Sequence, residues 1–329
     1  MFTALAERTA ARVIPDHGRR GIPSLAGALA SASAGWRRPA RLASTELVPA
    51  LALRLLRGSV QAEVLDLHDQ PRLQAEALGV PPAAGRGRDL DRLFDRNVAA
   101  FARLVVPSRS FVDLCRLPAD RVVVVTNGTD CEQIVPRPAP PEPVVAMVSG
   151  AAPGRGIELL LGAMARVRAE IPAATLRLAL TATGPASGQY LRALAMNLRD
   201  RDPWVSLAEV DYRGLGAFLG EAAVMVIPHP ANPYFDVATP VKLFDSMAAG
   251  RPLAVTPRHE TRNIVEGCRA GVVAASDTPD DLAEAILTLL RSGALRDEMG
   301  ANGRRWALER YDWRVMSAGL ADAILGPAA

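Results

Sequence analysis

The sequence predicts an α/β protein with two Rossmann-like domains, each built on a parallel sheet. Three observations support this prediction. The chain has 329 residues, which is long for one core and suits two domains. Apolar runs of strand length alternate with helical periods, and five prolines lie within residues 136–143, where neither a helix nor a central strand can continue. We interpret residues 136–143 as the linker between the two domains.

The alternation is most regular after the linker. Short apolar runs predict strands at residues 144–148, 176–180, 205–207, 224–227, 253–255 and 271–274. Helical periods predict helices at residues 156–169, 189–198, 215–221, 242–249 and 279–291, with one more short helix before the last strand. Strict alternation of this kind implies right-handed βαβ crossovers and a parallel sheet covered on both faces.

The N-terminal part repeats this pattern less completely. Strands are predicted at residues 11–15, 63–67, 104–107 and 121–126, and helical periods cover residues 46–57 and 93–104. No opening strand followed by a glycine-rich turn is recognisable ahead of Glu63. We therefore predict a shortened N-terminal domain over residues 1–138, a C-terminal domain over residues 139–311, and a final helix within residues 312–329.

Composition excludes several classes of protein. The net charge of +3 comes from basic residues scattered along the chain, without the aromatic and basic stripe of a nucleic-acid surface. Cys115, Cys131 and Cys268 lack paired spacing, so we expect small core residues and neither disulfides nor a zinc site. The charged N-terminus is unlike a signal peptide, and no apolar run is long enough to span a bilayer. We expect a cytoplasmic protein that binds no nucleic acid; a homodimer is one compatible assembly.

The first motif is Ser149-Gly-Ala-Ala-Pro-Gly-Arg-Gly156, between a predicted strand and a predicted helix. Glycines such as Gly150 would let the backbone approach a ligand, and the following helix N-terminus favours phosphate. Arg155 would add a guanidinium that can contact two phosphate oxygens. A plain structural turn explains the motif equally well, because such turns occur in every α/β domain.

The second motif is the turn-rich stretch of residues 228–240, which follows a strand and leads into a helix ending at Gly250. In a parallel sheet this loop lies at the carboxyl ends of the strands, where ligands bind. The helix N-terminus and Lys242 would face a diphosphate, and Asp245 would accept hydrogen bonds from a ribose diol. The alternative is that Lys242 and Asp245 form a surface pair of little energetic value.

From about Val64 onward, the chain resembles the retaining GT-B glycosyltransferases of glycosyltransferase family 4. Four matches occur in the family's order. They are Asp66-Leu-His-Asp69, Val122-Val-Val-Val-Thr-Asn-Gly-Thr-Asp130 against "vipNGvD", Gly154-Arg-Gly-Ile-Glu-Leu-Leu-Leu161 against "KGid.Ll", and the stretch from Pro240 to Ala254 against "P.KlfEyma.GkPvv". The resemblance implies two Rossmann-like domains that face each other across a cleft, with a C-terminal helix that packs back on the N-domain.

The resemblance also implies a set of site residues. Donor-binding positions fall on Gly150, Arg155, Gly184, Asp236, Val237, Ala238, Thr239, Lys242, Leu243 and Asp245. The catalytic positions are His68 and Asp69, where the imidazole would contact the transferred sugar or charge developing in the transition state. A histidine that merely caps a strand end is the alternative. His17, His229 and His259 lie in turn-rich segments, and of these only His229 borders the donor loop.

Several positions depart from the family pattern. The family has two glutamates separated by seven residues; here the second is the shorter Asp245, and the first is Val237 with Asp236 beside it. The family's phosphate-binding lysine is replaced by Arg155, and the arginine usually found after the first strand's glycine is absent. These changes predict a rebuilt donor pocket.

The leading functional hypothesis is a glycosyltransferase that moves a sugar from a nucleoside diphosphate sugar to an acceptor with retention of configuration, without a metal or cofactor. The nucleotide sugar is then a co-substrate, and the acceptor would be a secondary metabolite or glycan in a bacterium of high GC content. Two alternatives are a non-catalytic nucleotide-sugar-binding subunit and an isomerase or hydrolase such as a nucleotide-sugar epimerase. The sequence leaves the nucleobase, the sugar and the acceptor open.

Overall fold

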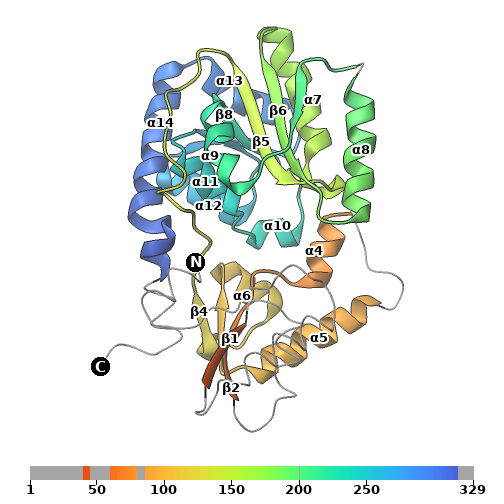
Figure 1. Ribbon diagram of the computed structural model, residues 1–329, viewed down its shortest axis with the longest axis vertical. Helices are drawn as coiled ribbons and strands as arrows, with labels where there is room; N and C mark the ends of the chain where they lie inside the picture. The colour runs from red at the N-terminus through yellow and green to blue at the C-terminus, as the bar shows by residue number, and fades with distance from the viewer. Residues whose placement is uncertain (1–39, 45–59, 80–85, 200, 318–329) are drawn as a thin grey trace. The chain divides into compact units, whose positions relative to one another are not determined.

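A computed structural model describes residues 40–44, 60–79, 86–199 and 201–317 (Figure 1). The chain divides into two compact units: unit 1 comprises Met1–Gln74, Pro82–Thr126 and Trp313–Ala329, and unit 2 comprises Ala75–Pro81 and Asn127–Asp312. The predicted strand at residues 11–15, the helical period at 46–57 and most of the predicted final helix lie outside the described residues.

Unit 2 contains a six-stranded parallel sheet. Its strands are β5 (Val144–Gly150), β6 (Thr175–Thr181), β7 (Val205–Ala208), β8 (Val224–Ile227), β9 (Leu253–Val255) and β10 (Gly271–Val273). The strand order is β10-β9-β8-β5-β6-β7, so the chain starts in the middle, builds one half and returns to build the other. The order reverses between β5 and β8, and their carboxyl ends form the topological switch point where Rossmann-like sheets bind ligands.

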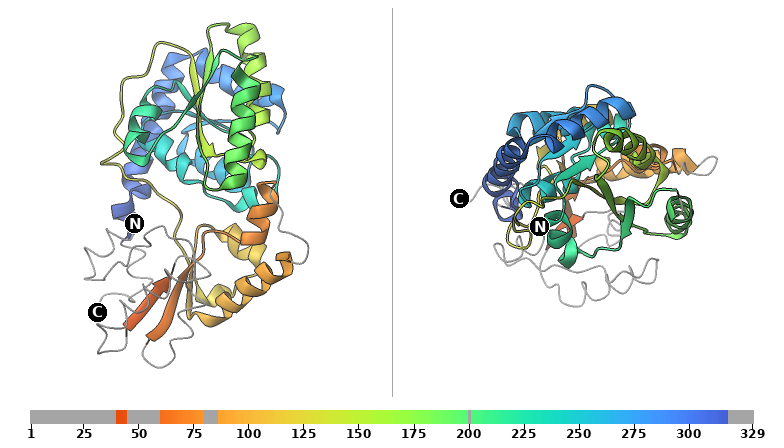
Figure 2. Two further views of the ribbon diagram at one scale, coloured as in Figure 1. Left: turned by 45° about the vertical axis from the view of Figure 1, so that its right-hand side comes forward. Right: turned by 90° about the horizontal axis from the view of Figure 1, so that it is seen from above.

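Helices cover both faces of this sheet (Figures 1 and 2). They are α7 (Ile157–Glu170), α8 (Pro185–Arg199), α9 (Tyr212–Gly220), α10 (Pro233–Val237), α11 (Val241–Ala248), α12 (His259–Cys268), α13 (Pro279–Leu290) and α14 (Gly293–Trp306), with short turns η2 (Pro153–Arg155) and η3 (Ala307–Tyr311). Alternate residues of β5 serve the two faces: Val145 and Met147 join the core under α7, α8 and α13, whereas Ala146 joins the core under α9, α11 and α12. The predicted Rossmann-like domain is confirmed.

Two helices of unit 2 are absent from the sequence-based prediction. Helix α10 lies within the turn-rich stretch, where Asn232 caps it and Pro233 occupies its first turn. Helix α14 contains three glycines, Gly293, Gly300 and Gly303, which weaken the helical pattern in the sequence. Gly300 packs against Gly250, just beyond the end of α11. A Cβ on Gly300 would lie 2.2 Å from the carbonyl oxygen of Gly250. Tertiary packing therefore outweighs the low helix propensity of glycine.

The proline-rich stretch does not separate the two units, contrary to its interpretation as a linker. The division falls between residues 126 and 127, and residues 136–143 lie within unit 2. The buried Arg251 fastens them there: its Nη2 donates hydrogen bonds to the carbonyl oxygens of Arg137, Pro138 and Gly220 at 2.7, 3.1 and 2.7 Å. Proline removes backbone donors but keeps its carbonyl, so a guanidinium can hold such a segment against a domain.

Unit 1 contains a four-stranded parallel sheet in the order β1-β2-β3-β4. Its elements are β1 (Ala40–Ser44), β2 (Val60–Asp66), α5 (Arg86–Ala100), β3 (Arg103–Val106), α6 (Arg109–Cys115), η1 (Ala119–Arg121) and β4 (Val122–Val124), and α4 (Pro71–Ala77) follows β2 along the chain. Strand β1 is absent from the sequence-based prediction. It is short and weakly apolar in sequence, and its parallel pairing with β2 is what defines it.

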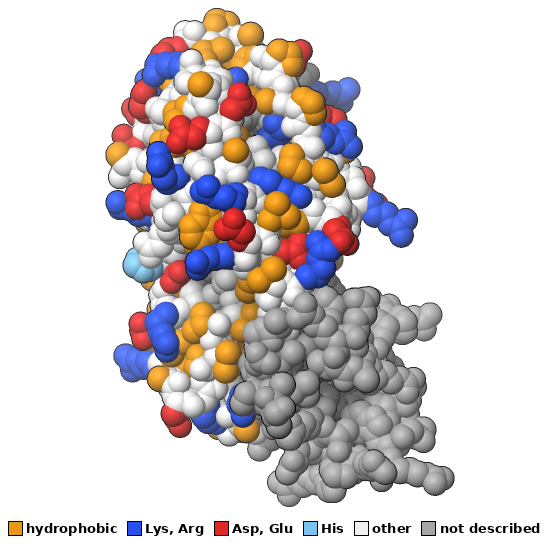
Figure 3. Space-filling model, turned by 90° about the vertical axis from the view of Figure 1, so that its left-hand side faces the viewer, with side chains coloured by type: hydrophobic (Ala, Val, Ile, Leu, Met, Phe, Trp, Pro, Cys, Tyr) orange, Lys and Arg blue, Asp and Glu red, His pale blue; other side chains and the backbone are white. Residues whose placement is uncertain are grey.

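The compositional predictions can be compared with the described residues. On the described face that Figure 3 shows, basic and acidic side chains are intermixed. Cys131 and Cys268 are buried, and all three cysteines are free. Among the described helices, none combines the length and the apolar character that crossing a membrane requires.

Candidate functional site

The switch point of unit 2 brings the two sequence motifs together. The first motif follows β5 and the second follows β8, and Gly156 lies where the two loops meet. Gly156 has φ of +77°, and a Cβ there would lie 1.8 Å from the carbonyl oxygen of Pro228. Only glycine fits this position, because a side chain would be both strained and in collision with backbone.

Gly154 has a similar structural role. A Cβ on Gly154 would lie 1.9 Å from the carbonyl oxygen of Ala77, and its N–H donates to the carbonyl of Leu78 at 3.3 Å. Close backbone packing thus explains both Gly154 and Gly156. Gly150 and Gly184 are different: at Gly150 only Arg155 comes within 4 Å of an added Cβ, and at Gly184 nothing does.

Lys242 is the central cation of the switch point. Its Nζ lies 3.5 Å from Ser149 Oγ at the end of β5, and no carboxylate of the described residues forms an ion pair with it. Burial and, second, the charge of Arg155 lower the pKa of Lys242 to about 7. A half-buried ammonium between a hydroxyl and a guanidinium is a site that an anion would stabilise.

His229 lies close to the same cations. Its side chain is 1% exposed, its ring stacks on Phe235 with 4.3 Å between centroids, and neither ring nitrogen has a hydrogen-bond partner among the described residues. Burial, followed by the charges of Lys242, Arg155 and Arg258, holds the pKa of His229 well below its usual value. The imidazole is therefore neutral, and the positive charge of the site belongs to the arginines and Lys242.

Two helix N-termini lie at the same edge of the sheet. Helix α7 begins after Gly156 and α11 begins after Pro240, and neither cap residue supplies a side-chain hydrogen bond to the helix. The first N–H groups of each helix are consequently left for other acceptors. Together with Arg155 and Lys242, they give this edge the chemistry of an oxyanion or phosphate site.

Asp236 is not free to replace the missing first glutamate of the family motif. Arg258 Nη1 lies 3.3 Å from Asp236, and Arg258 Nη2 donates to both carboxylate oxygens of Asp277 at 2.7 and 3.0 Å. The neighbouring Val237 is buried, so the motif's first position offers an apolar side chain. The sequence analysis named Asp236 as a donor-binding position beside Val237; the structure shows it pairing with Arg258.

Asp245 occupies a buried polar position on α11. Its Oδ1 accepts a hydrogen bond from Thr129 Oγ1 at 2.7 Å, and burial raises its pKa to about 7 although this hydrogen bond lowers it. Lys242 contacts Ser149 instead, so the interpretation of Lys242 and Asp245 as a surface pair is wrong.

The remaining predicted donor-loop residues divide between this edge and the core. The carbonyl of Thr239 accepts from Asn127 Nδ2 at 2.7 Å, which fastens the loop to the chain just after the division between the units. Ala238 is partly exposed at the end of α10. Leu243 is fully buried in the core, so its side chain packs against the sheet and is not part of the site.

Sequence reasoning missed four side chains that shape this site: Thr129, Ser149, Phe235 and Arg258. Ser149 and Phe235 stand inside the two motifs and could have been included for that reason. Arg258 follows β9, whose carboxyl end lies at the same edge as that of β8. The sequence marks Thr129 only as a threonine at a position where the family pattern has valine, and this difference alone does not indicate a role in the site.

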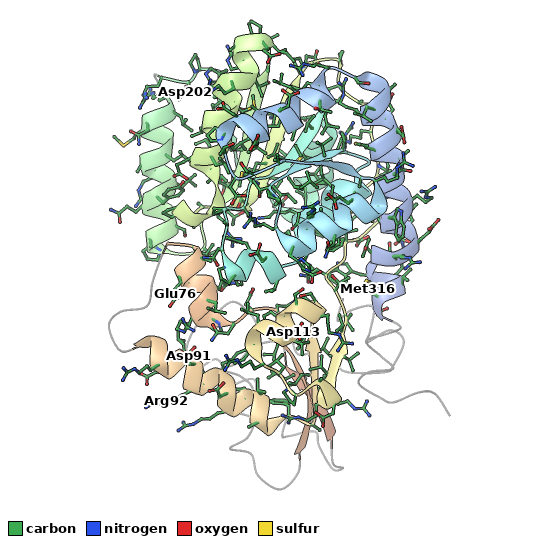
Figure 4. All side chains as sticks on the ribbon, turned by 180° about the vertical axis from the view of Figure 1, so that it is seen from behind. Glu76, Asp91, Arg92, Asp113, Asp202 and Met316 are labelled. Atoms are coloured by element: carbon green, nitrogen blue, oxygen red, sulfur yellow. The ribbon has the colours of Figure 1, made fainter. Side chains whose placement is uncertain are left out.

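The second predicted site lies in unit 1, directly after β2. His68 Nε2 is 2.9 Å from Asp66 Oδ2, with side-chain exposures of 36% and 5%. Burial lowers the pKa of His68, but the hydrogen bond and charge of Asp66 and the charge of Asp69 outweigh it, so the pKa is raised. The following loop is held by Asp91 of α5, labelled in Figure 4, which accepts from Gln70 and Arg72 at 2.7 and 2.9 Å.

Solved structures match this architecture over most of the chain. HepE of Anabaena, in complex with UDP and glucose, aligns with a TM-score of 0.73 at 16% identity over 100% of this chain and 89% of that chain. Sucrose-phosphate synthase from Thermosynechococcus elongatus aligns with a TM-score of 0.70 at 17% identity over 92% of this chain and 76% of that chain. With its two parallel-sheet units, the protein has the GT-B fold.

The sequence comparisons indicate which group of glycosyltransferases the chain resembles. Residues 142–292 match the family described as glycosyl transferases group 1, and over this part of the chain the resemblance to group 1 glycosyltransferases is confirmed. Phosphatidyl-myo-inositol mannosyltransferase of Mycobacterium leprae is 30% identical over 112 residues, 34% of this chain and 29% of that protein. D-inositol 3-phosphate glycosyltransferase 2 of Catenulispora acidiphila is 25% identical over 281 residues, 80% of this chain and 62% of that protein. In both comparisons the chain spans less than two thirds of the relative.

Proposed function

We propose that this protein is a glycosyltransferase that binds a nucleoside diphosphate sugar at the switch point of unit 2 and transfers the sugar to an acceptor. The observation that carries the proposal is the pair of cations Lys242 and Arg155 at the carboxyl edge of a Rossmann-like sheet, beside two helix N-termini that no cap side chain satisfies. Lys242 has no carboxylate partner among the described residues. The group 1 domain over residues 142–292 agrees with it.

The diphosphate would take the place of the missing counter-ion. Its oxygens would accept hydrogen bonds from Lys242 and Arg155 and from the first N–H groups of α7 and α11. These groups would neutralise the charge that develops on the leaving diphosphate, which is the main chemical task in sugar transfer from such donors. The arrangement assigns to side chains a task that a metal ion could also perform, and metal independence is part of the proposal.

The ribose would bind at Asp245. A carboxylate can accept from both hydroxyls of a diol, and Asp245 lies one turn into α11 from Lys242. In unit 1, His68 and Asp69 are the proposed catalytic pair. A protonated His68 held by Asp66 could donate to a sugar hydroxyl or to a developing negative charge. Retention of configuration, as in the resembled family, completes the proposal.

The relatives suggest which donors and acceptors to test first. GDP-mannose is the donor named for an α-(1-6)-phosphatidylinositol monomannoside mannosyltransferase of Mycolicibacterium smegmatis, which is 26% identical over 186 residues, 56% of this chain and 48% of that protein. UDP-glucose is bound in a HepE structure. Inositol phosphates and phosphatidylinositol are acceptors suggested by the relatives' names, beside secondary metabolites and glycans.

The decisive experiment is a donor panel. Purified protein is incubated with UDP-, GDP-, CDP- and dTDP-sugars, with and without these acceptors, while nucleoside diphosphate release and product mass are measured. We expect one donor to be consumed and one acceptor to gain a hexose mass, and NMR of the product's anomeric centre tests retention. Binding of a donor without any turnover would contradict transferase activity and favour a non-catalytic nucleotide-sugar-binding subunit.

A further inference from the structure

We propose that Thr129 is a positioning residue for the donor: its hydroxyl holds the short carboxylate of Asp245 in the orientation that binds the ribose. This inference rests on the proposed function, in which Asp245 contacts the ribose. It concerns a residue outside both sequence motifs, 116 positions away from Asp245 along the chain.

Two departures from the family pattern meet in this contact. The chain reads Asn127-Gly-Thr-Asp130 where the family stretch has valine at the third position, and it has Asp245 where the family has glutamate. In the structure these two side chains contact each other, with 2.7 Å between Thr129 Oγ1 and Asp245 Oδ1. Aspartate is one methylene shorter than glutamate, and a hydroxyl in place of a methyl group supplies a donor beside the shorter side chain.

Thr129 is well placed to act as a fixed donor. Its side chain is fully buried, its N–H donates to the carbonyl of Tyr311 at 2.8 Å, and it forms a parallel bridge with Asp312. Arg304 braces the next turn by donating to the carbonyls of Cys131 and Ile134 at 3.2 and 2.9 Å. The backbone that carries the hydroxyl is thus held on several sides, and the hydrogen bond costs little additional ordering.

The second carboxylate oxygen of Asp245, Oδ2, is the atom that the Thr129 contact leaves for the ribose. Oδ1 accepts from Thr129, whereas no described residue donates a hydrogen bond to Oδ2. A carboxylate anchored through one oxygen presents the second in a fixed direction, as preorganised ligand sites require. Without the Thr129 hydroxyl, the buried carboxylate would lose its donor and its fixed orientation.

A double-mutant cycle tests this coupling. We would compare Thr129→Val, Asp245→Glu and the combined variant, using isothermal titration with UDP and GDP as the probes. Thr129→Val should weaken nucleotide binding by about tenfold or more, since hydrogen bonds to charged groups are among the stronger ones. Asp245→Glu alone should also weaken binding, because the longer side chain must compete with the Thr129 hydroxyl for space. The combined variant restores the family's residue pair and should bind better than either single variant.

Two further variants serve as controls. Thr129→Ser keeps the hydroxyl and should bind within a few fold of the unaltered protein. Thr261→Val removes a buried hydroxyl that has no hydrogen-bond partner in the described structure, and it should leave nucleotide affinity unchanged and the Tm unchanged or slightly raised. Thermal melts of all variants separate loss of folding from loss of binding.

The outcomes distinguish this inference from the proposed function. If Thr129→Val binds nucleotide as tightly as the unaltered protein while Asp245→Ala does not bind, the donor site stands and the role of Thr129 is disproved. The same conclusion follows if Asp245→Glu fails to improve binding in the Thr129→Val background. If Asp245→Ala binds normally, the proposed placement of the ribose fails, and the inference fails with it.

Discussion

The two predicted sites of this protein differ in how their charges are balanced. In unit 1, His68 has a buried carboxylate partner 2.9 Å away, and its pKa is raised. In unit 2, Lys242 has a hydroxyl at 3.5 Å and a neighbouring guanidinium, and its pKa is lowered to about 7. A cation that has its partner is stable without ligand, whereas a cation that lacks one destabilises the free protein until an anion binds.

This difference indicates what each site is prepared to do. The Lys242 site holds positive charge at a cost in folding free energy, which is typical of a ligand-binding site. The His68 site holds an oriented, more readily protonated imidazole, which suits a hydrogen-bond donor. The contrast leads to four predictions.

Gly156→Ala should damage the Lys242 site most severely. The new Cβ would stand 1.8 Å from the Pro228 carbonyl oxygen at a φ of +77°, so we expect a loss of about 3 kcal/mol or more in unfolding free energy. Gly267→Ala is the matched control. It lies within α12 with nothing within 4 Å, and should be neutral or stabilising by up to about 1 kcal/mol. Urea denaturation checks both; equal stability of the two variants would contradict the close loop contact.

Lys242→Met should separate binding from stability. Loss of the ammonium should weaken UDP or GDP binding by about 100-fold, because a charge-assisted contact to phosphate at a half-buried site is worth a few kcal/mol. The same variant should raise the Tm of the ligand-free protein, since it removes a cation that has no carboxylate partner among the described residues. Calorimetry and titration measure the two effects. A variant that is both less stable and fully able to bind would reverse the assignment of Lys242.

The pH dependence should differ in sign between the sites. Lys242 titrates near 7 in the free protein and at higher pH when an anion is bound, so nucleotide affinity should fall by up to about tenfold per unit above pH 7. In the ligand-free protein, the unfolded chain holds the lysine proton between pH 7 and about 10.5 while the folded one does not, so this group makes stability rise over that window. Lys242→Arg should abolish the alkaline loss of affinity; its persistence in that variant would point to another group.

Asp66→Asn should produce the smallest and most local change. The amide keeps a hydrogen-bonding atom near His68 Nε2 but removes the charge, so the pKa of His68 should fall. Because the pKa of His68 is raised in the folded protein, the protonated imidazole stabilises the fold below pH 6.5, and this contribution is lost as the pH rises through the folded pKa. Asp66→Asn should remove this pH-dependent contribution to the free energy of unfolding. NMR titration of the imidazole measures the shift, with Asp95→Asn on the surface helix α5 as the control. An unchanged pKa would mean that Asp66 does not govern His68.

Several elements could be predicted from the sequence because local patterns define them. Strands β8 and β9 begin and end where the apolar runs do, since central parallel strands are buried on both faces. Helix α11 and its stop at Gly250 followed from periodicity and a positive-φ glycine. The alternation after residue 143 determined the Rossmann-like class, and the two motifs predicted a candidate site at one edge of one sheet.

Other features depended on contacts between distant residues, which no local pattern reveals. Arg251 placed the proline-rich stretch within unit 2, Arg258 engaged Asp236, and pairing with β2 created a strand from residues 40–44. The same is true of Thr129 and Asp245, whose separate departures from the family pattern become one hydrogen bond only after folding. Sequence by itself determined the fold class and supplied the residues that we propose bind a diphosphate. The tertiary structure decided which of those charges are already paired, because pairing depends on distance and burial.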